Sequence, residues 1–143
     1  MTPSDTLSDR VQRAIELFGI DDEGAIAALA PCYSDDMVFV DPIQEIHGKA
    51  GFLEANRRLT RRSRDMRMRV EAKEEQPHQI FMRWHLRYAL RLMPAMEIEG
   101  VSHMEVRGGL VVRQQDFWDP LGAAMGAVPG LGFVYRRLTA LFG

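Results

Sequence analysis

The first third of the chain carries the hydrophobic spacing of helices. One face of a predicted first helix holds the apolar residues Leu7, Val11, Ala14, Ile15 and Phe18. Ser4 or Asp5 is placed to cap this helix, because a short polar side chain there accepts from the first free backbone N–H groups. A second, alanine-rich helix is predicted to begin at Asp21 or Asp22 and to stop before Pro31. Both helices therefore have one face that suits a core.

A short strand and a third helix follow. Residues 37–40 are rich in β-branched and aromatic side chains and run into Asp41 and Pro42, which predicts a strand that ends there. Proline restricts the backbone of the preceding aspartate to the extended region. A third helix is predicted over residues 48–59, with Phe52 on its apolar face.

From residue 66 onwards the apolar residues alternate with charged ones. This spacing predicts a strand over residues 66–72 that has one apolar and one charged face. A second strand, predicted over residues 80–92, has the apolar face Ile80, Met82, Trp84, Leu86, Tyr88, Leu90 and Leu92. Its other face is charged and includes Arg83 and His85. We expect the apolar face to line a core and the charged face to meet solvent or a partner subunit.

A turn near residues 93–95 predicts a hairpin with the strand that follows. Pairing Leu92 with Met96 places Arg83 opposite Glu105, which is a favourable cross-strand charge pair. In this register the inner face of the next strand holds Met96, Ile98, Gly100, Ser102 and Met104.

The direction of Asp116 depends on the last hairpin, which turns at residues 107–109. A two-residue turn at Gly108 and Gly109 would place Asp116 on the outer face of the sheet. A three-residue loop with a bulge would turn it inward, beside Gly100. Beyond this strand, the tail after Pro129 predicts an amphipathic helix, which we expect to act as a lid over the open end of the sheet.

The order of these elements predicts the fold class. Helices followed by long antiparallel strands are typical of an α+β domain, with the helices packed on one face of a strongly curved, mostly antiparallel sheet. At 143 residues the chain suits one core, so we predict a single soluble domain over residues 1–143. A curved sheet covered by helices encloses a cavity, and we expect an apolar small molecule to bind there.

Composition and charge narrow the classes of partner. Lys+Arg 18 against Asp+Glu 20 gives a net charge of -2, so the chain lacks the positive field that attracts nucleic acid. No run reaches the roughly 18 apolar residues of a membrane span. The single cysteine, Cys32, forms no internal disulfide. We therefore expect a cytoplasmic protein without a nucleic-acid or membrane partner, and the histidine spacing predicts no metal site.

Three segments resemble the nuclear transport factor 2 superfamily. They are YSDDMVFVDPIQEIHGKAGF at residues 33–52, GVSHMEVRGGLVV at residues 100–112 and RQQDFWDP at residues 113–120. The superfamily includes ketosteroid isomerases, limonene-epoxide hydrolases and SnoaL-like polyketide cyclases. The resemblance implies a cone-shaped fold in which three N-terminal helices wrap the sheet, and a homodimer formed through the outer face of that sheet. Fold alone does not decide function, because the superfamily holds catalysts, binding modules and assembly domains.

The resemblance marks two carboxylates as candidate catalytic residues. Asp41 matches the base of ketosteroid isomerases, which lies in a similar Asp-Pro motif. Asp116 matches the aspartate with which limonene-epoxide hydrolases activate water, and this match favours its inward direction. Desolvation in an apolar cavity raises a carboxyl pKa, which suits a general base near neutral pH. The residues alone leave two alternatives open: a turn in which Asp41 accepts backbone N–H groups, and a hydrogen-bonded cluster of Asp116, Gln114 and Ser102.

Part of the isomerase machinery is missing. Ala14 and Ser102 stand where ketosteroid isomerases place the tyrosine and the aspartic acid that bind the oxyanion. Enolate stabilisation by two strong donors is therefore not expected.

We predict a cofactor-free enzyme of the isomerase, hydrolase or cyclase kind, with Asp41 and Asp116 as its acid–base pair. The residues expected to line its pocket are Phe52, Met82, Trp84, Leu86, Tyr88, Ser102, Met104, Gln114 and Trp118. Two other classes remain open, a non-catalytic module that binds a hydrophobic ligand and a dimeric assembly domain.

Overall fold

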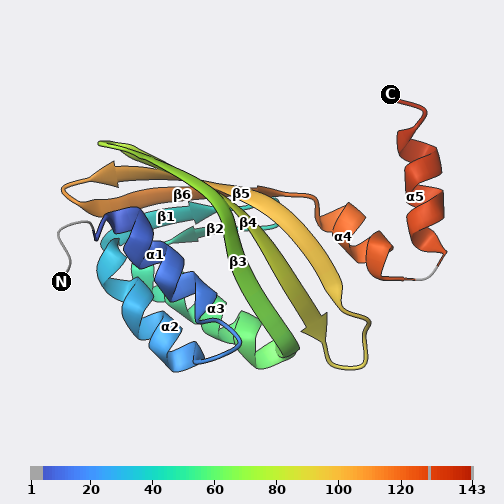
Figure 1. The fold of residues 1–143 in the computed structure, drawn as a ribbon, viewed down its shortest axis with the longest axis horizontal. Coiled ribbons are helices and arrows are strands. Elements are labelled where there is room, and N and C mark those ends of the chain that lie inside the picture. The colour runs from blue at the N-terminus through green and yellow to red at the C-terminus, as the bar shows by residue number, and fades with distance from the viewer. Residues whose placement is uncertain (1–4, 129, 143) are drawn as a thin grey trace.

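The computed structural model describes residues 5–128 and 130–142, which form helices and one sheet (Figure 1). The N-terminal helices are α1 (Leu7–Glu16), α2 (Asp22–Leu29) and α3 (Lys49–Arg62), and a short 3-10 helix, η1 (Ala30–Cys32), follows α2. The strands are β1 (Tyr33–Val40), β2 (Glu45–His47), β3 (Ser63–Gln76), β4 (Gln79–Leu90), β5 (Met96–Arg107) and β6 (Leu110–Trp118). Two C-terminal helices are α4 (Pro120–Ala127) and α5 (Leu131–Thr139).

The sheet is curved, open and mostly antiparallel. Its strand order is β2-β1-β6-β5-β4-β3, and the contact between β1 and β6 is the one parallel pairing among the described strands. Helices α1, α2 and α3 gather against one face of the sheet (Figure 1). This arrangement confirms the predicted α+β class, with helices on one side of a curved sheet. No helix in the described ranges combines the length and the apolar character that crossing a membrane requires.

Short polar side chains begin the first two helices. Thr6 accepts from the backbone N–H of Asp9 at 3.2 Å, and Asp9 accepts in return from the backbone N–H of Thr6 at 3.1 Å. The predicted cap at Asp5 is therefore wrong by one residue, and Ser4 lies outside the described residues. The predicted cap of α2 is confirmed, since Asp21 accepts from the backbone N–H of Gly24 at 3.0 Å.

The core lies between these helices and the inner face of the sheet. Val11 and Ala14 of α1 and Ala25 of α2 have no exposed surface, and Phe52 of α3 packs against the ring of Tyr33. The apolar face predicted for the first helix is therefore the face that the sheet covers.

The register of β4 against β5 differs from the predicted one by four residues. Met96 pairs with Tyr88 instead of Leu92, because β4 ends at Leu90 and the chain leaves the sheet in a longer loop. Leu92 lies in that loop with a φ of 65° and a fully exposed side chain. An even shift keeps every side chain on its predicted face, so Ser102 still points inward.

The outer face of the sheet is a charged surface, as the alternation predicts. Arg83 binds Glu71 of β3 at 2.9 Å, and the predicted pair of Arg83 with Glu105 is wrong because of the register shift. His85 lies 2.8 Å from Glu97, on the same face. Both Arg83 and His85 therefore point away from the cavity.

The C-terminal helix α5 reaches the cavity with Leu131 at its first position, but the rest of the helix does not cover the open end as predicted. It projects away from the sheet (Figure 1). Helix α4, which the sequence analysis did not predict, takes the place beside the cavity instead. Asp119 caps α4 by accepting from Gly122 N at 2.9 Å, and Pro120 occupies its first turn. The hydroxyl of Tyr135 donates to Asp119 at 2.6 Å and thereby attaches α5 to α4.

Candidate functional site

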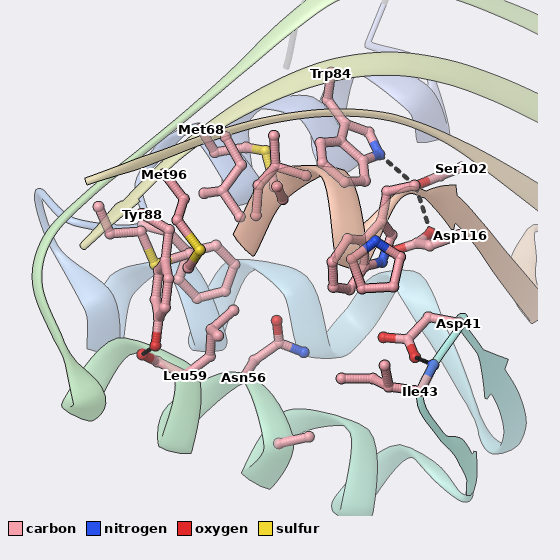
Figure 2. A pocket seen from close by; sticks show the side chains of 18 of the residues that line it. Asp41, Ile43, Asn56, Leu59, Met68, Trp84, Tyr88, Met96, Ser102 and Asp116 are labelled. Carbon is pink, nitrogen blue, oxygen red and sulfur yellow. Dashed lines mark hydrogen bonds between the residues drawn. The ribbon is translucent and has the colours of Figure 1, made fainter. Parts of the chain in front are cut away.

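A cavity of about 670 Å³ lies between α1, α3, α4 and the inner face of the sheet. Most of its wall is apolar, which is typical of sites that take small organic molecules of roughly 300–1,000 Å³. Figure 2 shows Asp41 and Asp116 at one end of this cavity and Tyr88 and Met96 at the other.

Nearly all of the predicted pocket residues line this cavity. They are Phe52, Trp84, Leu86, Tyr88, Ser102, Met104, Gln114 and Trp118, together with Asp41 and Asp116. Met82 is the exception, because it is fully buried as the strand partner of Ser102 and does not reach the cavity wall.

Five side chains form a hydrogen-bonded chain at the end of the cavity that holds Asp116. We call them the polar cluster: Tyr33, Trp84, Ser102, Gln114 and Asp116. The indole N–H of Trp84 donates to Ser102 Oγ at 2.9 Å, and that hydroxyl donates to Asp116 Oδ1 at 2.6 Å (Figure 2). Gln114 Nε2 donates to the same Oδ1 at 2.9 Å, and the Tyr33 hydroxyl donates to Gln114 Oε1 at 2.5 Å. The hydrogen-bonded cluster of Asp116, Gln114 and Ser102, which the sequence suggested as an alternative to a catalytic role, is therefore present.

A bulge in β6 directs Asp116 inward. Gly108 and Gly109 form a two-residue turn with φ of 61° and 76°, a backbone conformation that glycine adopts without strain. The register then shifts by one residue at Val112, so that Asp116 pairs with Ser102. The predicted link between a two-residue turn and an outward Asp116 is wrong, because the extra residue lies in the strand rather than in the turn.

Burial dominates the electrostatics of Asp116. The exposed part of its side chain faces the cavity, and desolvation raises the pKa of its carboxyl group to about 6. Hydrogen bonds from Ser102 and Gln114 oppose this rise, and the negative charge of Asp41 adds to it. The carboxyl group therefore exchanges its proton close to neutral pH.

Asp41 holds a turn and also lines the cavity. Its Oδ1 accepts from the backbone N–H of Ile43 at 2.9 Å and from that of Gln44 at 3.0 Å. This is the turn that the Asp-Pro sequence left open as an alternative. The same side chain lies in the cavity wall, so the turn and pocket interpretations both describe it.

The sequence matches one family over most of its length. The model of the SnoaL-like domain matches residues 11–114. The chain belongs to the SnoaL-like domain family.

Solved structures share the fold of this SnoaL-like chain at low sequence identity. A Catenulispora acidiphila protein with a ketosteroid isomerase-like fold, in complex with trimethylamine, has a TM-score of 0.70 and 12% identity over 89% of this chain and 93% of its own. An LEH-like epoxide hydrolase of M. tuberculosis has a TM-score of 0.66 and 14% identity over 90% and 96%. A putative ketosteroid isomerase of Kribbella flavida has a TM-score of 0.59 and 22% identity over 82% of each chain.

These likenesses confirm the predicted nuclear transport factor 2-like fold, and the family match confirms the predicted SnoaL-like resemblance. They do not carry an activity, because a fold of this kind serves several functions. No curated protein sequence matches the chain.

The sequence analysis missed three parts of the SnoaL-like site. Tyr33 completes the polar cluster. It is separated from the inward-facing Met37 and Phe39 by an even number of positions, so alternation along a longer first strand would have placed it on the inner face. Helix α4 contributes Ala123 and Ala124 to the cavity wall, and the Asp-Pro pair before it was its signal. Asn56 lines the cavity one helical turn after Phe52, so helical spacing along α3 would have found it.

Nothing in the described ranges gathers three or more metal-ligating side chains. The polar groups of the cavity wall are carboxylates, amides, hydroxyls and indoles.

Proposed function

We propose that this SnoaL-like chain is a cofactor-free enzyme that moves a proton on an apolar small molecule, with Asp116 as the reacting acid or base. The observation that carries the proposal is a carboxyl group in an apolar cavity wall with a pKa raised to about 6. General acid–base catalysis is most effective when the pKa of the catalytic group lies near the working pH. Asp116 meets that condition at neutral pH.

The polar cluster supports this role because it holds the carboxyl group in one orientation. Ser102 and Gln114 both donate to Oδ1, and no described residue donates to Oδ2. We propose that Oδ2 takes the proton from the substrate or returns it. A base that its neighbours already orient has less freedom to lose when the substrate binds.

Asp41 has the secondary part in the proposed acid–base pair. Its Oδ1 is engaged by the backbone of the turn at Ile43 and Gln44, whereas its charge helps to raise the pKa of Asp116. We propose that Asp41 tunes Asp116 and contacts the substrate in the cavity.

Reactions that build an enolate fit this cavity less well than hydrolysis or cyclisation. Ala14 offers no donor, and the one hydroxyl hydrogen of Ser102 points at Asp116. A missing oxyanion donor costs roughly 3 kcal/mol of transition-state stabilisation. A base that activates water or a substrate hydroxyl does not need that donor.

The first test needs no substrate. A carbon-detected NMR titration of the ligand-free protein should give Asp116 a pKa near 6, against about 3.9 for an unperturbed aspartate. A value at or below about 3.9 would contradict the proposal.

The second test measures turnover of styrene oxide. We expect kcat/KM to rise with pH through about 6 and Asp116→Asn to lower it at least ~100-fold. Asp36→Asn, a change at an exposed carboxylate on β1, is the matched control and should leave kcat/KM unchanged. Hydrolysis that survives in Asp116→Asn would assign catalysis to another group.

One observation favours a second candidate, a non-catalytic module for an apolar ligand. Both carboxylates already accept hydrogen bonds from the protein, Asp41 in its turn and Asp116 in the polar cluster. In such a module, Trp84→Ala would weaken ligand binding while Asp116→Asn would leave it unchanged.

We also propose a homodimer through the outer face of the sheet. Phe81, Val101 and Phe117 lie on that face with 40%, 36% and 52% of their surface exposed. Val101 and Phe117 are direct partners across β5 and β6, and Phe81 stacks on His103 with ring centroids 4.5 Å apart. A second copy would cover these apolar side chains and leave the charged network around them at the rim.

A further inference from the structure

Three donor groups of the polar cluster carry a single hydrogen each, and all three donate it to other residues of the protein. The hydroxyl of Ser102 donates to Asp116, the indole of Trp84 donates to Ser102, and the hydroxyl of Tyr33 donates to Gln114. Each of these three groups carries one hydrogen, so none has a donor left for a ligand.

Two further donors of the cavity wall are also bonded to the protein. The hydroxyl of Tyr88 donates to the backbone carbonyl of Leu59 at 3.1 Å (Figure 2). The amide of Asn56 directs one of its two N–H groups to the carbonyl of Phe52 at 2.9 Å. The indole N–H of Trp118 has no partner among the described residues. The wall therefore keeps neutral donors on Trp118 and on the second N–H of the Asn56 and Gln114 amides, and none of these donors carries a positive charge.

Acceptors and negative charge remain available. Asp116 Oδ2 has no hydrogen-bond partner in the described part of the chain, and Asp41 adds a second carboxylate to the wall. No lysine, arginine or histidine of the described residues lines the cavity. The charged side chains that the structure describes in this mostly apolar wall are thus both carboxylates, Asp41 and Asp116.

We propose that this cavity selects an apolar molecule that carries a protonated amine, with Oδ2 of Asp116 as the counter-ion. The inference rests on the proposed function in that it uses the same cavity and the same carboxylate. It names the chemical class of the ligand, which the acid–base proposal leaves open.

The aromatic residues of the wall suit such a cation. Trp84, Trp118, Phe39 and Phe52 line the same cavity, and the face of an aromatic ring attracts an ammonium group. An ammonium ion also compensates the buried charge of Asp116. A neutral alcohol supplies one hydrogen bond and leaves that charge uncompensated, and a carboxylate ligand adds a like charge beside it.

The test compares three probes that share one apolar body: biphenyl-4-ylmethylamine, biphenyl-4-ylmethanol and biphenyl-4-carboxylate. Isothermal titration calorimetry of the full chain at pH 7.5 should show the amine binding at least ~10-fold more tightly than the alcohol, because hydrogen bonds to charged groups are the stronger ones. The carboxylate should bind at least ~10-fold more weakly than the alcohol. The proposal would be overturned if the amine and the alcohol bound with equal affinity or if the carboxylate bound best. It would also be overturned if no amine binding were detected at about 1 mM.

Variants assign the preference to Asp116. Asp116→Asn should remove the preference for the amine and leave the affinity for the alcohol within about 3-fold, well under the ~10-fold effect expected for the charge. Asp36→Asn, which removes an exposed carboxylate, should change neither affinity. In the unmutated protein, saturating amine should lower the pKa of Asp116 towards the ordinary aspartate range, and the alcohol should not.

Failure of this inference is distinguishable from failure of the proposed function. If the wild type prefers the amine but Asp116→Asn keeps its turnover, the ligand inference stands and the acid–base role is contradicted. Turnover that depends on Asp116, without any preference for the amine, would contradict the inference alone.

Discussion

Ser102 and Asp116 face each other directly across β5 and β6, and the serine hydroxyl donates to Oδ1 of the aspartate at 2.6 Å. This pairing exists because Val112 is an extra residue in β6. Without that residue the alternation of the strand would turn Asp116 to the outer face. A single bulge thus decides whether the cavity has a carboxyl group with a raised pKa.

Asp116 should make the stability of the protein depend on pH in an uncommon direction. Its folded pKa of about 6 lies above its value of about 3.9 in an unfolded chain, so the folded state holds the proton more tightly. The stability that this proton provides is complete below about pH 3.9 and is lost as the pH rises through about 6. Relative to the wild type, Asp116→Asn should therefore gain as much as about 3 kcal/mol of unfolding free energy between pH 4 and pH 8. Urea unfolding of both proteins at the two pH values measures this change.

A carboxylate of opposite character provides the control for that experiment. The backbone N–H of Gly122 and the hydroxyl of Tyr135 hold the pKa of Asp119 below its usual range. The stability that this lowered pKa provides is complete above the unfolded value of about 3.9 and is lost only at lower pH, so Asp119→Asn should differ from the wild type by a nearly constant amount between pH 4 and pH 8. A difference between wild type and Asp116→Asn that stays constant with pH would contradict the raised pKa.

Ser102→Ala should disturb the polar cluster at both of its neighbours. The indole of Trp84 loses its acceptor, and leaving a buried donor unsatisfied costs about 1–3 kcal/mol of unfolding free energy. Asp116 loses a donor that lowers its pKa, so the pKa should rise further above about 6. NMR titration and urea unfolding measure the two effects. Ser34→Ala, at a hydroxyl that donates to the exposed Asp36, is the control, and an unchanged Asp116 pKa in Ser102→Ala would contradict the cluster.

Gly100 makes room for the ring of Trp84. A Cβ at this position would lie 2.4 Å from Trp84 Cζ2 and 2.9 Å from the carbonyl oxygen of Phe117. Gly100→Ala should therefore destabilise the protein by about 1–3 kcal/mol and displace the indole from the cavity wall. Thermal unfolding and tryptophan fluorescence measure both effects.

The matched control for that substitution is Gly126→Ala in α4. A Cβ there meets nothing within 4 Å, and alanine is the better helix former, so this variant should be more stable by roughly 0.5–1 kcal/mol. Equal stability of the two variants would show that Trp84 can move away without cost.

The proposed homodimer predicts that charge on the outer face dissociates it. Phe117→Glu places a carboxylate opposite Val101, in the middle of the exposed apolar residues of that face. Sedimentation velocity at micromolar concentration should show a dimer for the wild type and a monomer for Phe117→Glu. Leu138→Glu, on the exposed surface of α5, should leave the dimer intact. A wild-type monomer would contradict the proposal.

Alternation in the sequence determined which face the residues of β4 and β5 occupy. Trp84, Tyr88 and Ser102 were assigned to the inner face, and Arg83 to the outer face, because the two-residue period of a strand is a local property of the backbone. Helical spacing likewise identified Val11 and Ala14 as core residues. These assignments survived a register error of four residues because the shift was even.

Only the tertiary structure decided where the strands meet and what closes the cavity. The loop after Leu90, the bulge at Val112 and the packing of α4 over the cavity all depend on contacts between segments distant in sequence. The pKa of Asp116 follows from the same packing, since desolvation is set by everything that surrounds a carboxyl group. A sequence pattern carries the periodicity of each element, whereas burial and register arise when the elements pack together.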